Sequence, residues 1–505
     1  MNPLFKYWLW VVSITIWATL CFVVPDFIDN PIDGWQGIVT QLAYITACGI
    51  GNMFVLYLIG CNKYVCATIL PIYGIIGAAV AFYRAVFHVT ITPMIIEVTL
   101  HTNVEEAMGV ISWQIIAWVL LNAGISVGFC YVRFKHIRIE REWIHALIVL
   151  LLGTCYLMYN SRLNRSLRQR YPFNLVYNLK DYQMLQRIVS EERIIPKYNL
   201  IDVPDSVTVV LVIGEAVRAD HLQLNGYDRE TTPRLVQRNN LISLPYIYSE
   251  QTHTLASLPY ILTRADSVHD EYQYTETSFV PIFRNEEFRT SWISNQDLGE
   301  TFAHFLLECD TSIFANAGKS TYVFSPWVDE ELLPILDHLE QKKHARNLYI
   351  LHTIGSHWYY NNHVPPDYYY FQPVTTNRLI TNNSIEQIVN SYDNTIRYLD
   401  CFLDSVITRF ENQTAIIIYQ SDHSEALGEN GEYLHANETE QAKHPACVIW
   451  YSEKYAQLFP KKIQALHTNQ HNRYRTDYLF YSILETVGIK ASGENASVNI
   501  FCENP

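Results

Sequence analysis

Five long apolar runs dominate the first part of the chain. They cover about Tyr7–Val24, Gly37–Gly60, Tyr64–Phe82, Gly109–Tyr131 and Trp143–Tyr159. Each is about long enough to cross roughly 30 Å of hydrocarbon as a helix. The first run has no small-residue cleavage site before Pro25, so we expect an uncleaved anchor rather than a signal peptide. The pattern predicts a five-helix transmembrane domain over residues 1–160.

Charged residues between these runs predict the orientation in the membrane. The loop Asp26–Trp35 carries three aspartates and no Lys or Arg. The loop between the fourth and fifth runs is basic, with Arg133, Lys135, Arg138 and Arg141. This difference places the amino terminus in the cytoplasm and, after five spans, everything beyond Tyr159 outside. Four arginines would then lie on the outer side, where they can meet lipid phosphates: Arg162, Arg165, Arg168 and Arg170.

The pattern changes after residue 160. Residues 161–200 are polar, contain two prolines, and are typical of a linker with a helix or two. From about Leu200, strand-like and helical segments alternate, which predicts a globular domain over residues 201–505. The 505 residues carry a net charge of −14, and no basic run interleaved with aromatic residues occurs here, which argues against a nucleic-acid partner.

Cysteine spacing excludes one kind of metal site. None of the ten cysteines forms a C-x-x-C pair, so a cysteine zinc cluster is not expected. Four cysteines lie in the soluble part and permit one or two disulfides without assigning them: Cys309, Cys401, Cys447 and Cys502.

Three apolar β-branched runs each end in a side chain that can handle a metal or a proton. Ala415–Tyr419 leads to Asp422 and His423, and Val207–Ile213 leads through Gly214 to Glu215. Because ligands bind at the carboxyl ends of strands in open α/β sheets, these oxygen and nitrogen donors could converge on Zn²⁺ or Mn²⁺. The alternative for Glu215 is that it caps a helix starting at Ala216.

Two histidines and a threonine are further candidates for the chemistry at these strand ends. The run Asn347–His352 leads to His357, and His435 follows the Asp-His pair; either could act as general acid or base, although a structural or surface role suits each one alone. In Ser249–Thr263, a Thr-His-Thr run precedes a helical pattern. A threonine there is a poor nucleophile unless a base or metal activates it, and alone it would be an N-cap.

The chain resembles the membrane-bound phosphoethanolamine transferases, which modify lipid A or core sugars and include the colistin-resistance enzymes of the alkaline phosphatase/sulfatase superfamily. The resemblance covers essentially the whole chain. It rests on V-I-G-E-A-x-R-x-D-H-x-x-L-N-G-Y-x-R-x-T-T-P at Val212–Pro233, T-x-T-x-x-S-x-P at Thr252–Pro259, S-N-Q at Ser294–Gln296, G-S-H at Gly355–His357, Y-D-N-T-I-R-Y-x-D at Tyr392–Asp400, S-D-H-x-E-x-L-G-E-N-G-x-Y-L-H at Ser421–His435, and T-N-x-x-E-A at Thr102–Ala107.

This resemblance implies a fold, a site and partners. The fold is a five-helix transmembrane domain followed by an α/β/α sandwich of alkaline phosphatase/sulfatase type in the periplasm, anchored in the bacterial inner membrane. The cofactor is one zinc ion or two, with manganese as the alternative. The donor is phosphatidylethanolamine and the acceptor is lipid A or a related glycolipid or glycan. The implied metal ligands are Glu215, Thr254, Asp422 and His423, with Thr254 also the nucleophile.

The remaining implied roles concern the substrates. His357 and His435 would contact the phosphoryl group or leaving oxygen, or a second zinc. Thr102 and Glu106, in an outer loop over residues 83–107, would help seat the ethanolamine headgroup, although the residues alone favour an amphipathic surface turn. Here Glu250 and Tyr260 occupy positions where the family often has a disulfide, so we expect packing to hold the nucleophile loop.

Further departures concern single positions: Gln251 and Ser424 replace glycines, Trp358-Tyr359 replaces Gly-Pro, and an asparagine usual in the outer loop has no counterpart near Val98. Two rival functions remain: a manganese-dependent phosphoglycerol transferase of the lipoteichoic-acid-synthase type, and a non-catalytic membrane scaffold that kept the fold. A sulfatase is less favoured, because position 254 holds neither Cys nor Ser.

Overall fold

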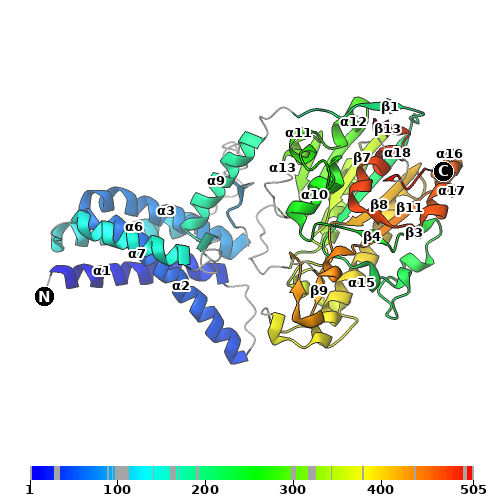
Figure 1. Cartoon of the computed structure of the whole chain (residues 1–505). Helices are drawn as coiled ribbons and strands as arrows, with labels where there is room; N and C mark the ends of the chain where they lie inside the picture. Colours follow the sequence, from blue (N-terminus) through cyan, green and yellow to red (C-terminus); the bar gives the residue numbers. More distant parts are fainter. Residues whose placement is uncertain are drawn as a thin grey trace. The chain divides into compact units, whose positions relative to one another are not determined.

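The structure is a computed structural model, shown in Figure 1. It describes residues 3–27, 34–87, 90–93, 95–96, 113–139, 142–159, 167–168, 170–188, 193–296, 303–316, 326–342, 344–377, 380–436, 439–492 and 498–502. The chain divides into two compact units at Met184 and Leu185. We call them the amino-terminal and carboxy-terminal units and describe each by itself.

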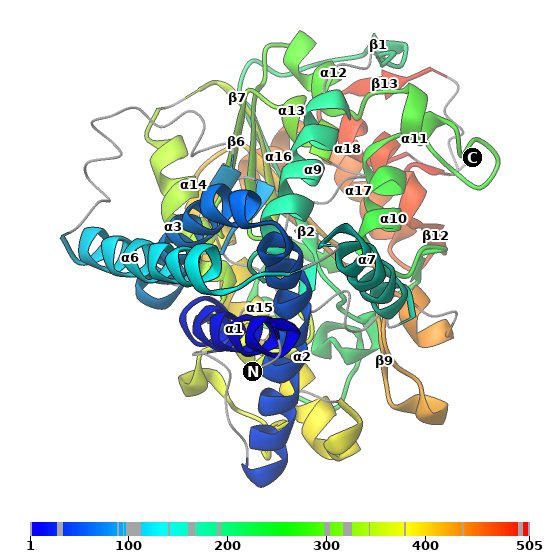
Figure 2. The same cartoon turned by 90° about the vertical axis from the view of Figure 1, so that its left-hand side faces the viewer.

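Long apolar helices make up the amino-terminal unit (Figure 2). Helix α1 (Pro3–Ala18) continues through a π-helical turn and a 3-10 turn to Phe27. The others are α2 (Gly34–Cys61), α3 (Lys63–Phe87), α6 (Trp113–His136) and α7 (Glu142–Tyr159), and the more polar helix α9 (Phe173–Ile188) follows them. Among the described residues, four segments are long and apolar enough to cross a membrane: Pro3–Phe27, Gly34–Cys61, Lys63–Val86 and Trp113–His136.

The fifth predicted span forms α7, but its described apolar part, Ile144–Cys155, is shorter than the other four segments. Apolar helices at the start of the chain are therefore confirmed, and the number five stays a prediction.

One buried arginine of this unit has its donors satisfied by backbone carbonyls of the same unit, as a hydrocarbon environment favours. The Arg133 guanidinium is buried and donates to the carbonyls of Gly60, Cys61 and Ile137 at 2.6–2.9 Å. These bonds give the buried guanidinium acceptors at the end of α2 and just after α6.

A seven-stranded sheet forms the centre of the carboxy-terminal unit. Its strand order is β3-β11-β8-β2-β7-β5-β6. Five strands run parallel to one another in β8-β2-β7-β5-β6, and β11 is antiparallel to both β8 and β3. Their bounds are β2 Val207–Gly214, β3 Leu241–Ser243, β5 Arg289–Ser294, β6 Thr311–Phe314, β7 Arg346–His352, β8 Ala415–Ser421 and β11 Cys447–Tyr451.

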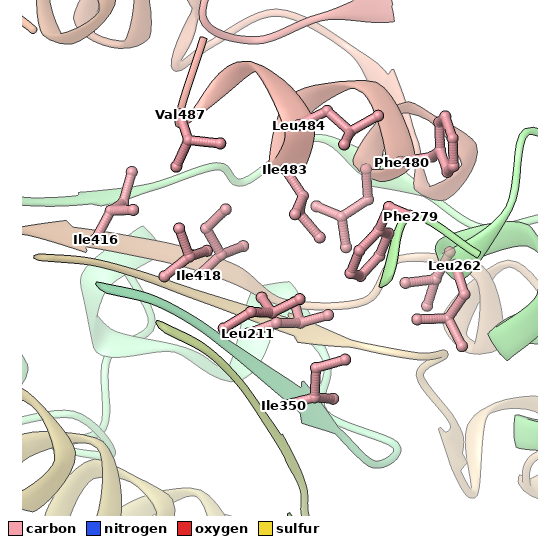
Figure 3. Packing of buried hydrophobic residues seen from close by; sticks show 14 of the residues in the cluster. Leu211, Leu262, Phe279, Ile350, Ile416, Ile418, Phe480, Ile483, Leu484 and Val487 are labelled. Atoms are coloured by element: carbon pink, nitrogen blue, oxygen red, sulfur yellow. The ribbon is translucent and has the colours of Figure 1, made fainter. Parts of the chain in front are cut away.

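Helices cover both faces of this sheet, because its central strands are apolar on both sides. On one face Leu211, Ile350 and Ile418 pack against Phe279 and Ile483 (Figure 3). On the other face, apolar side chains of the same strands pack against α14 (Leu332–Glu340) and α15 (Ile385–Phe410). The predicted α/β/α sandwich is present.

Shorter elements complete the unit. Three two-stranded ladders join β1 (Tyr198–Leu200) to β13 (Ile489–Ala491), β4 (Ile247–Tyr248) to β12 (Tyr474–Arg475), and β9 (Ala426–Leu427) to β10 (Tyr433–Leu434). The remaining helices are α10 (Thr254–Leu262), α11 (Tyr272–Thr275), α12 (Val280–Asn285), α13 (Ala303–Leu307), α16 (Glu453–Leu458), α17 (Pro460–Asn469) and α18 (Leu479–Glu485).

Candidate metal centre

Glu215 and Asp422 lie next to each other at the ends of neighbouring parallel strands. Strands β2 and β8 pair so that Gly214 lies opposite Ser421, and the next residues are Glu215 and Asp422. The N–H of Asp422 donates to the Gly214 carbonyl at 3.1 Å, and the N–H of Ala216 donates to Asp422 Oδ1 at 3.3 Å. Two carboxylates more than 200 residues apart in sequence thus meet at one edge of the sheet.

The alternative that Glu215 caps a helix starting at Ala216 is wrong. Ala216 has φ of 58°, in the left-handed region, and the next helical segment is a short 3-10 turn over Ala219–His221. The Tyr392 hydroxyl on α15 donates to the Ala216 carbonyl at 2.7 Å and accepts from the Arg218 N–H at 2.8 Å. These bonds occupy the backbone groups that a helix would need.

A glycine after β7 allows the loop there to approach Glu215 closely. Gly355 has φ of 49°, and a Cβ at this position would lie 2.9 Å from the Glu215 carbonyl oxygen. The buried Asp329 carboxylate accepts from the N–H groups of Ile354 and Gly355 at 2.8 and 3.0 Å. The conformation and the contact both favour glycine here.

Thr254 is the first residue of α10 and lies beside the two carboxylates. His253 precedes it in an extended conformation as the N-cap residue, without a capping side-chain bond. Thr254 Oγ1 donates to Glu215 Oε2 at 2.8 Å and lies 3.5 Å from His423 Nε2. The threonine hydroxyl is therefore in the same group as the donors from β2 and β8, rather than an N-cap.

Four side chains from three separated stretches offer one set of metal donors. His423 Nε2 lies 3.3 Å from Glu215 Oε1 and 3.5 Å from Asp422 Oδ2. Glu215, Asp422 and His423 are buried, and their donor atoms lie within 4.8 Å of one another.

Two atoms of this set test whether a cation fits. Within the described residues, Glu215 Oε1 and Asp422 Oδ2 are buried and accept no hydrogen bond, and the His423 ring nitrogen lies near both. Two buried carboxylates that share one imidazole are costly, and a divalent cation between these oxygens would lower that cost. Three oxygens and one imidazole nitrogen suit Zn²⁺ and Mn²⁺.

Electrostatics around these donors follow from burial and close charges. Burial, followed by the charge of Glu215, raises the pKa of Asp422 to about 6. Burial alone would lower the pKa of His423, but the Asp422 and Glu215 carboxylates raise it to about 10. The nearby imidazoles, led by His423, hold the pKa of Glu215 below its ordinary value against the effect of burial. Without a metal, the His423 imidazolium supplies the positive charge that these carboxylates require.

His357 and His435 lie on the same side of the sheet as the predicted ligands. Their ring centroids are 5.7 Å apart, and His435 lies 4.7 Å from the ring of His423. Together with Glu215 they form a second group of donor atoms within 4.8 Å of one another. Burial lowers the pKa of His357, so its imidazole is neutral near pH 7. The predicted acid–base histidines are therefore within the same cluster, and their roles stay a prediction.

Three residues support this cluster that sequence reasoning did not assign. Gln296 Nε2 donates to Glu215 Oε2 at 2.8 Å. The buried carboxylate of Glu425 accepts from the Tyr360 hydroxyl and lies 3.5 Å from His435 Nδ1. The S-N-Q and D-H-x-E motifs contain Gln296 and Glu425. The sequence therefore marked both residues but did not indicate what either one contacts.

Two positions at which this chain differs from the phosphoethanolamine transferases form an ion pair and a hydrogen bond. Glu250 pairs with Arg475 at 2.9 Å, and the Tyr260 hydroxyl donates to Asp270 at 2.5 Å, where the family often has cysteines. All ten cysteines are free thiols, so none of the permitted disulfides forms. Thr102 and Glu106 lie outside the described residues.

Comparison with known families covers both units. A model described as Sulfatase matches residues 207–489, and one described as Phosphoethanolamine transferase EptA/EptB matches residues 50–182. Phosphoethanolamine transferase EptA of Salmonella typhimurium is 31% identical over 310 residues, which cover 58% of this chain and 55% of that protein. The Kdo(2)-lipid A phosphoethanolamine 7''-transferase of Escherichia coli K12 is 30% identical over 269 residues, 50% of this chain and 45% of that protein.

The chain thus spans about half the length of the curated relatives it matches. Among solved structures, the integral membrane lipooligosaccharide phosphoethanolamine transferase A of Neisseria meningitidis has a similar fold. It aligns with a TM-score of 0.54 and 22% identity over 98% of this chain and 99% of that one.

Proposed function

The chain belongs to the sulfatase family, and from that premise we propose that it is a membrane-bound, metal-dependent phosphoethanolamine transferase. It moves phosphoethanolamine from phosphatidylethanolamine to lipid A or a related glycolipid. The observation that carries this proposal is the meeting of Thr254 with Glu215, Asp422 and His423, at distances of 2.8–3.5 Å, around buried carboxylate oxygens that accept no hydrogen bond. The names of the relatives supply the transferred group and the lipid A acceptor.

Zinc is the metal we propose, held by Glu215, Thr254, Asp422 and His423. When bound, it lowers the pKa of the coordinated hydroxyl and offsets negative charge on the phosphoryl oxygens. Glu215, His357 and His435 are candidates for a second ion. Manganese, the alternative, suits the same oxygen-rich donors.

The first step makes a covalent phospho-threonine. Thr254 loses its hydroxyl proton to solvent, Oγ attacks the phosphorus of phosphatidylethanolamine, the new P–O bond forms, and the bond to the glycerol oxygen breaks. Diacylglycerol leaves after its oxygen takes a proton from the His435 ring, because the His357 imidazole is neutral near pH 7. Glu425 orients His435 through its Nδ1 side.

The second step releases the enzyme. A hydroxyl or phosphate oxygen of the acceptor attacks the phosphorus, the bond to Thr254 Oγ breaks, and Oγ takes a proton from solvent to restore the hydroxyl. The histidine that protonated the leaving group accepts the proton of an attacking hydroxyl. Both substrates are lipids, so a membrane-anchored chain meets them in the bilayer; we place it in the bacterial inner membrane with the carboxy-terminal unit in the periplasm.

A single substitution tests the nucleophile. The full chain in nanodiscs receives phosphatidylethanolamine labelled in the headgroup, together with lipid A. We expect Thr254→Ala to lower transfer and diacylglycerol release by about 10³-fold or more, because no other hydroxyl replaces Oγ. Thr254→Ser should retain part of the activity. An alanine variant that still labels lipid A would overturn the assignment.

Two controls accompany this experiment. Metal analysis of the same preparations should find zinc in the wild type and in Thr254→Ala, which keeps three donors, and much less in Glu215→Gln. Labelled phosphatidylglycerol replaces the donor in a parallel reaction. Transfer from phosphatidylglycerol instead of phosphatidylethanolamine would identify a phosphoglycerol transferase, and no transfer with no bound metal would favour the scaffold.

A further inference from the structure

A second polar pocket lies in the carboxy-terminal unit, apart from the metal centre. Its volume is about 420 Å³. One wall comes from the tyrosine-rich segment Asp367–Tyr370, and the other from α15 and the residues that pack on it, including Arg234 and Arg397. None of the residues assigned to metal or phosphoryl chemistry lines it.

The Arg397 guanidinium is held in a fixed orientation. Its carbon lies 3.8 Å above the centre of the Tyr370 ring, and Nη1 donates to the Glu230 carbonyl. Within the described residues, its other nitrogens donate to no protein group. A planar guanidinium fixed on one face and one edge presents its remaining donors to a ligand without further loss of side-chain freedom.

Arg234 provides a second guanidinium with little internal pairing. Its backbone is anchored, because Asp400 accepts from the N–H groups of Arg234 and Leu235 at 3.0 and 2.9 Å. Its side chain is 53% exposed and reaches Asp404 only at 3.4 Å. Asp404 already accepts from Arg238 at 2.6 Å, so the Arg234 charge is only partly compensated.

The arginines, tyrosines and aspartate of this pocket together suit a phosphorylated sugar. Two arginine forks bind a phosphate or carboxylate through paired N–H donors. The rings of Tyr368 and Tyr370 are exposed, and Tyr368 and the face of Tyr370 that Arg397 leaves uncovered offer flat apolar surfaces with polar edges, which suit the face of a sugar ring. Asp367 at the rim can accept from hydroxyls. A bare anion would use only the arginines, whereas a phosphorylated sugar would use the whole lining.

Helix α15 connects this pocket to the metal centre. Tyr392 of α15 contacts Ala216, and Thr395 contacts Ser356 at 2.6 Å, next to the strand ends. Arg397 and Asp400 are five and eight residues beyond Tyr392, which is about 8–12 Å along a helix. An oligosaccharide can span such a distance, whereas an ethanolamine headgroup is too short.

We propose that this pocket binds a phosphate-bearing sugar of the acceptor glycolipid while another position of the same acceptor meets Thr254. That the bound sugar belongs to the acceptor glycolipid rests on the proposed function. Recognition of a phosphorylated sugar by Arg234, Arg397 and the two tyrosines rests on the pocket alone.

The binding experiment uses the full chain in nanodiscs and isothermal titration calorimetry with glucosamine 6-phosphate. We expect binding that Arg234→Gln and Arg397→Gln each weaken by about tenfold or more, and that Tyr368→Ala also weakens. Arg409→Gln, on the same helix but paired with Asp337 outside the pocket, is the matched control. Metal content verifies that each variant is folded.

Comparison ligands separate the contributions. Glucosamine and inorganic phosphate should each bind at least tenfold more weakly than glucosamine 6-phosphate. Equal binding of inorganic phosphate, or affinities that none of the pocket variants changes, would overturn the proposal. Tyr368→Ala keeps both arginines, so it tests the sugar face even where an arginine variant fails to fold.

A kinetic experiment distinguishes this proposal from the proposed function. Arg234→Gln should leave diacylglycerol release in the donor step unchanged and raise the KM for the acceptor at least fivefold, with kcat nearly constant. An unchanged KM would contradict an acceptor role for the pocket. Absence of diacylglycerol release from the wild type would instead contradict the proposed function, while the calorimetric result would still decide whether the pocket binds a sugar phosphate.

Discussion

Glu308, just after α13, is a carboxyl group whose ionisation opposes folding. Its Oε2 accepts from the Ser278 N–H at 3.0 Å and from the Ser278 hydroxyl, yet burial raises its pKa from 4.5 to about 7. Between these values the folded chain binds a proton that the unfolded chain has lost, so stability falls as pH rises from about 4.5 to 7. Glu308→Gln should remove this loss, on the order of 2 kcal/mol after allowance for partial exposure.

The measurement is the thermal unfolding midpoint of wild type and Glu308→Gln at pH 5, 6, 7 and 8. We expect the variant to gain relative to wild type by a few degrees as pH rises, because glutamine still accepts from Ser278. Glu271→Gln, at an exposed position in the same unit, should show no such trend. Parallel curves for Glu308→Gln and wild type would show that Glu308 is ionised throughout.

Among single residues, the sequence identified some members of the candidate site and missed others. Glu215, Asp422 and His423 could be found because each follows an apolar run, and parallel strands end at one edge of a sheet. Gln296 and Glu425 could not be assigned, because their partners, Glu215 and His435, are chosen by packing between distant segments. Their motifs were visible, but a motif does not show which atom a side chain contacts.

Helix α15 is the element that connects the sheet, the metal centre and the second pocket. It starts with a capping box, in which the Ser384 side chain accepts from the Gln387 N–H at 3.2 Å and Gln387 returns a bond to the Ser384 N–H at 2.9 Å. Ser384→Ala should cost about 1 kcal/mol, seen as a thermal midpoint lower by a few degrees. Ser384→Asp should retain most of the stability.

The loss of stability in Ser384→Ala should not change the candidate metal centre. The first α15 residue that contacts the strand-end loops is about two turns from Ser384, and the intervening helix is packed on the sheet through side chains such as Ile388 and Tyr392. Zinc content and kcat of Ser384→Ala should therefore equal those of wild type. A fall in metal content would show that α15 holds the site through its first turn.

Elements with a continuous apolar pattern were the ones that the sequence predicted well. The strands β2, β7 and β8 begin and end within about two residues of the predicted runs, because buried parallel strands are apolar on both faces. The short edge strands β3 and β6 have only partial burial and gave no clear signal. The alternative helix at Ala216 failed because Asp422 and Tyr392, both distant in sequence, bind the backbone there.

For the whole molecule, the count of membrane spans decides on which side the carboxy-terminal unit lies. Five spans put it opposite the amino terminus, whereas the four long described segments alone would put it on the same side. Two of the four arginines that follow the fifth apolar run, and that weigh against the predicted orientation, have structural contacts: Arg168 lies 4.3 Å from the Tyr177 ring, and Arg170 lies 4.3 Å from the Phe27 ring. Such contacts reduce the weight of these residues as determinants of orientation.

Protease access to the end of the chain tests whether the number of membrane spans is odd or even. A tobacco etch virus protease site and an epitope tag are added after Pro505, and the protein is produced in a Gram-negative host. We expect protease added to spheroplasts to remove the tag and inverted vesicles to protect it, because five spans, with α7 as the fifth, would put the end of the chain outside. A cytoplasmic protein with the same site should stay intact in the spheroplasts. The reverse pattern would mean that α7 does not cross, and phosphatidylethanolamine and lipid A of the outer leaflet could not then be the substrates.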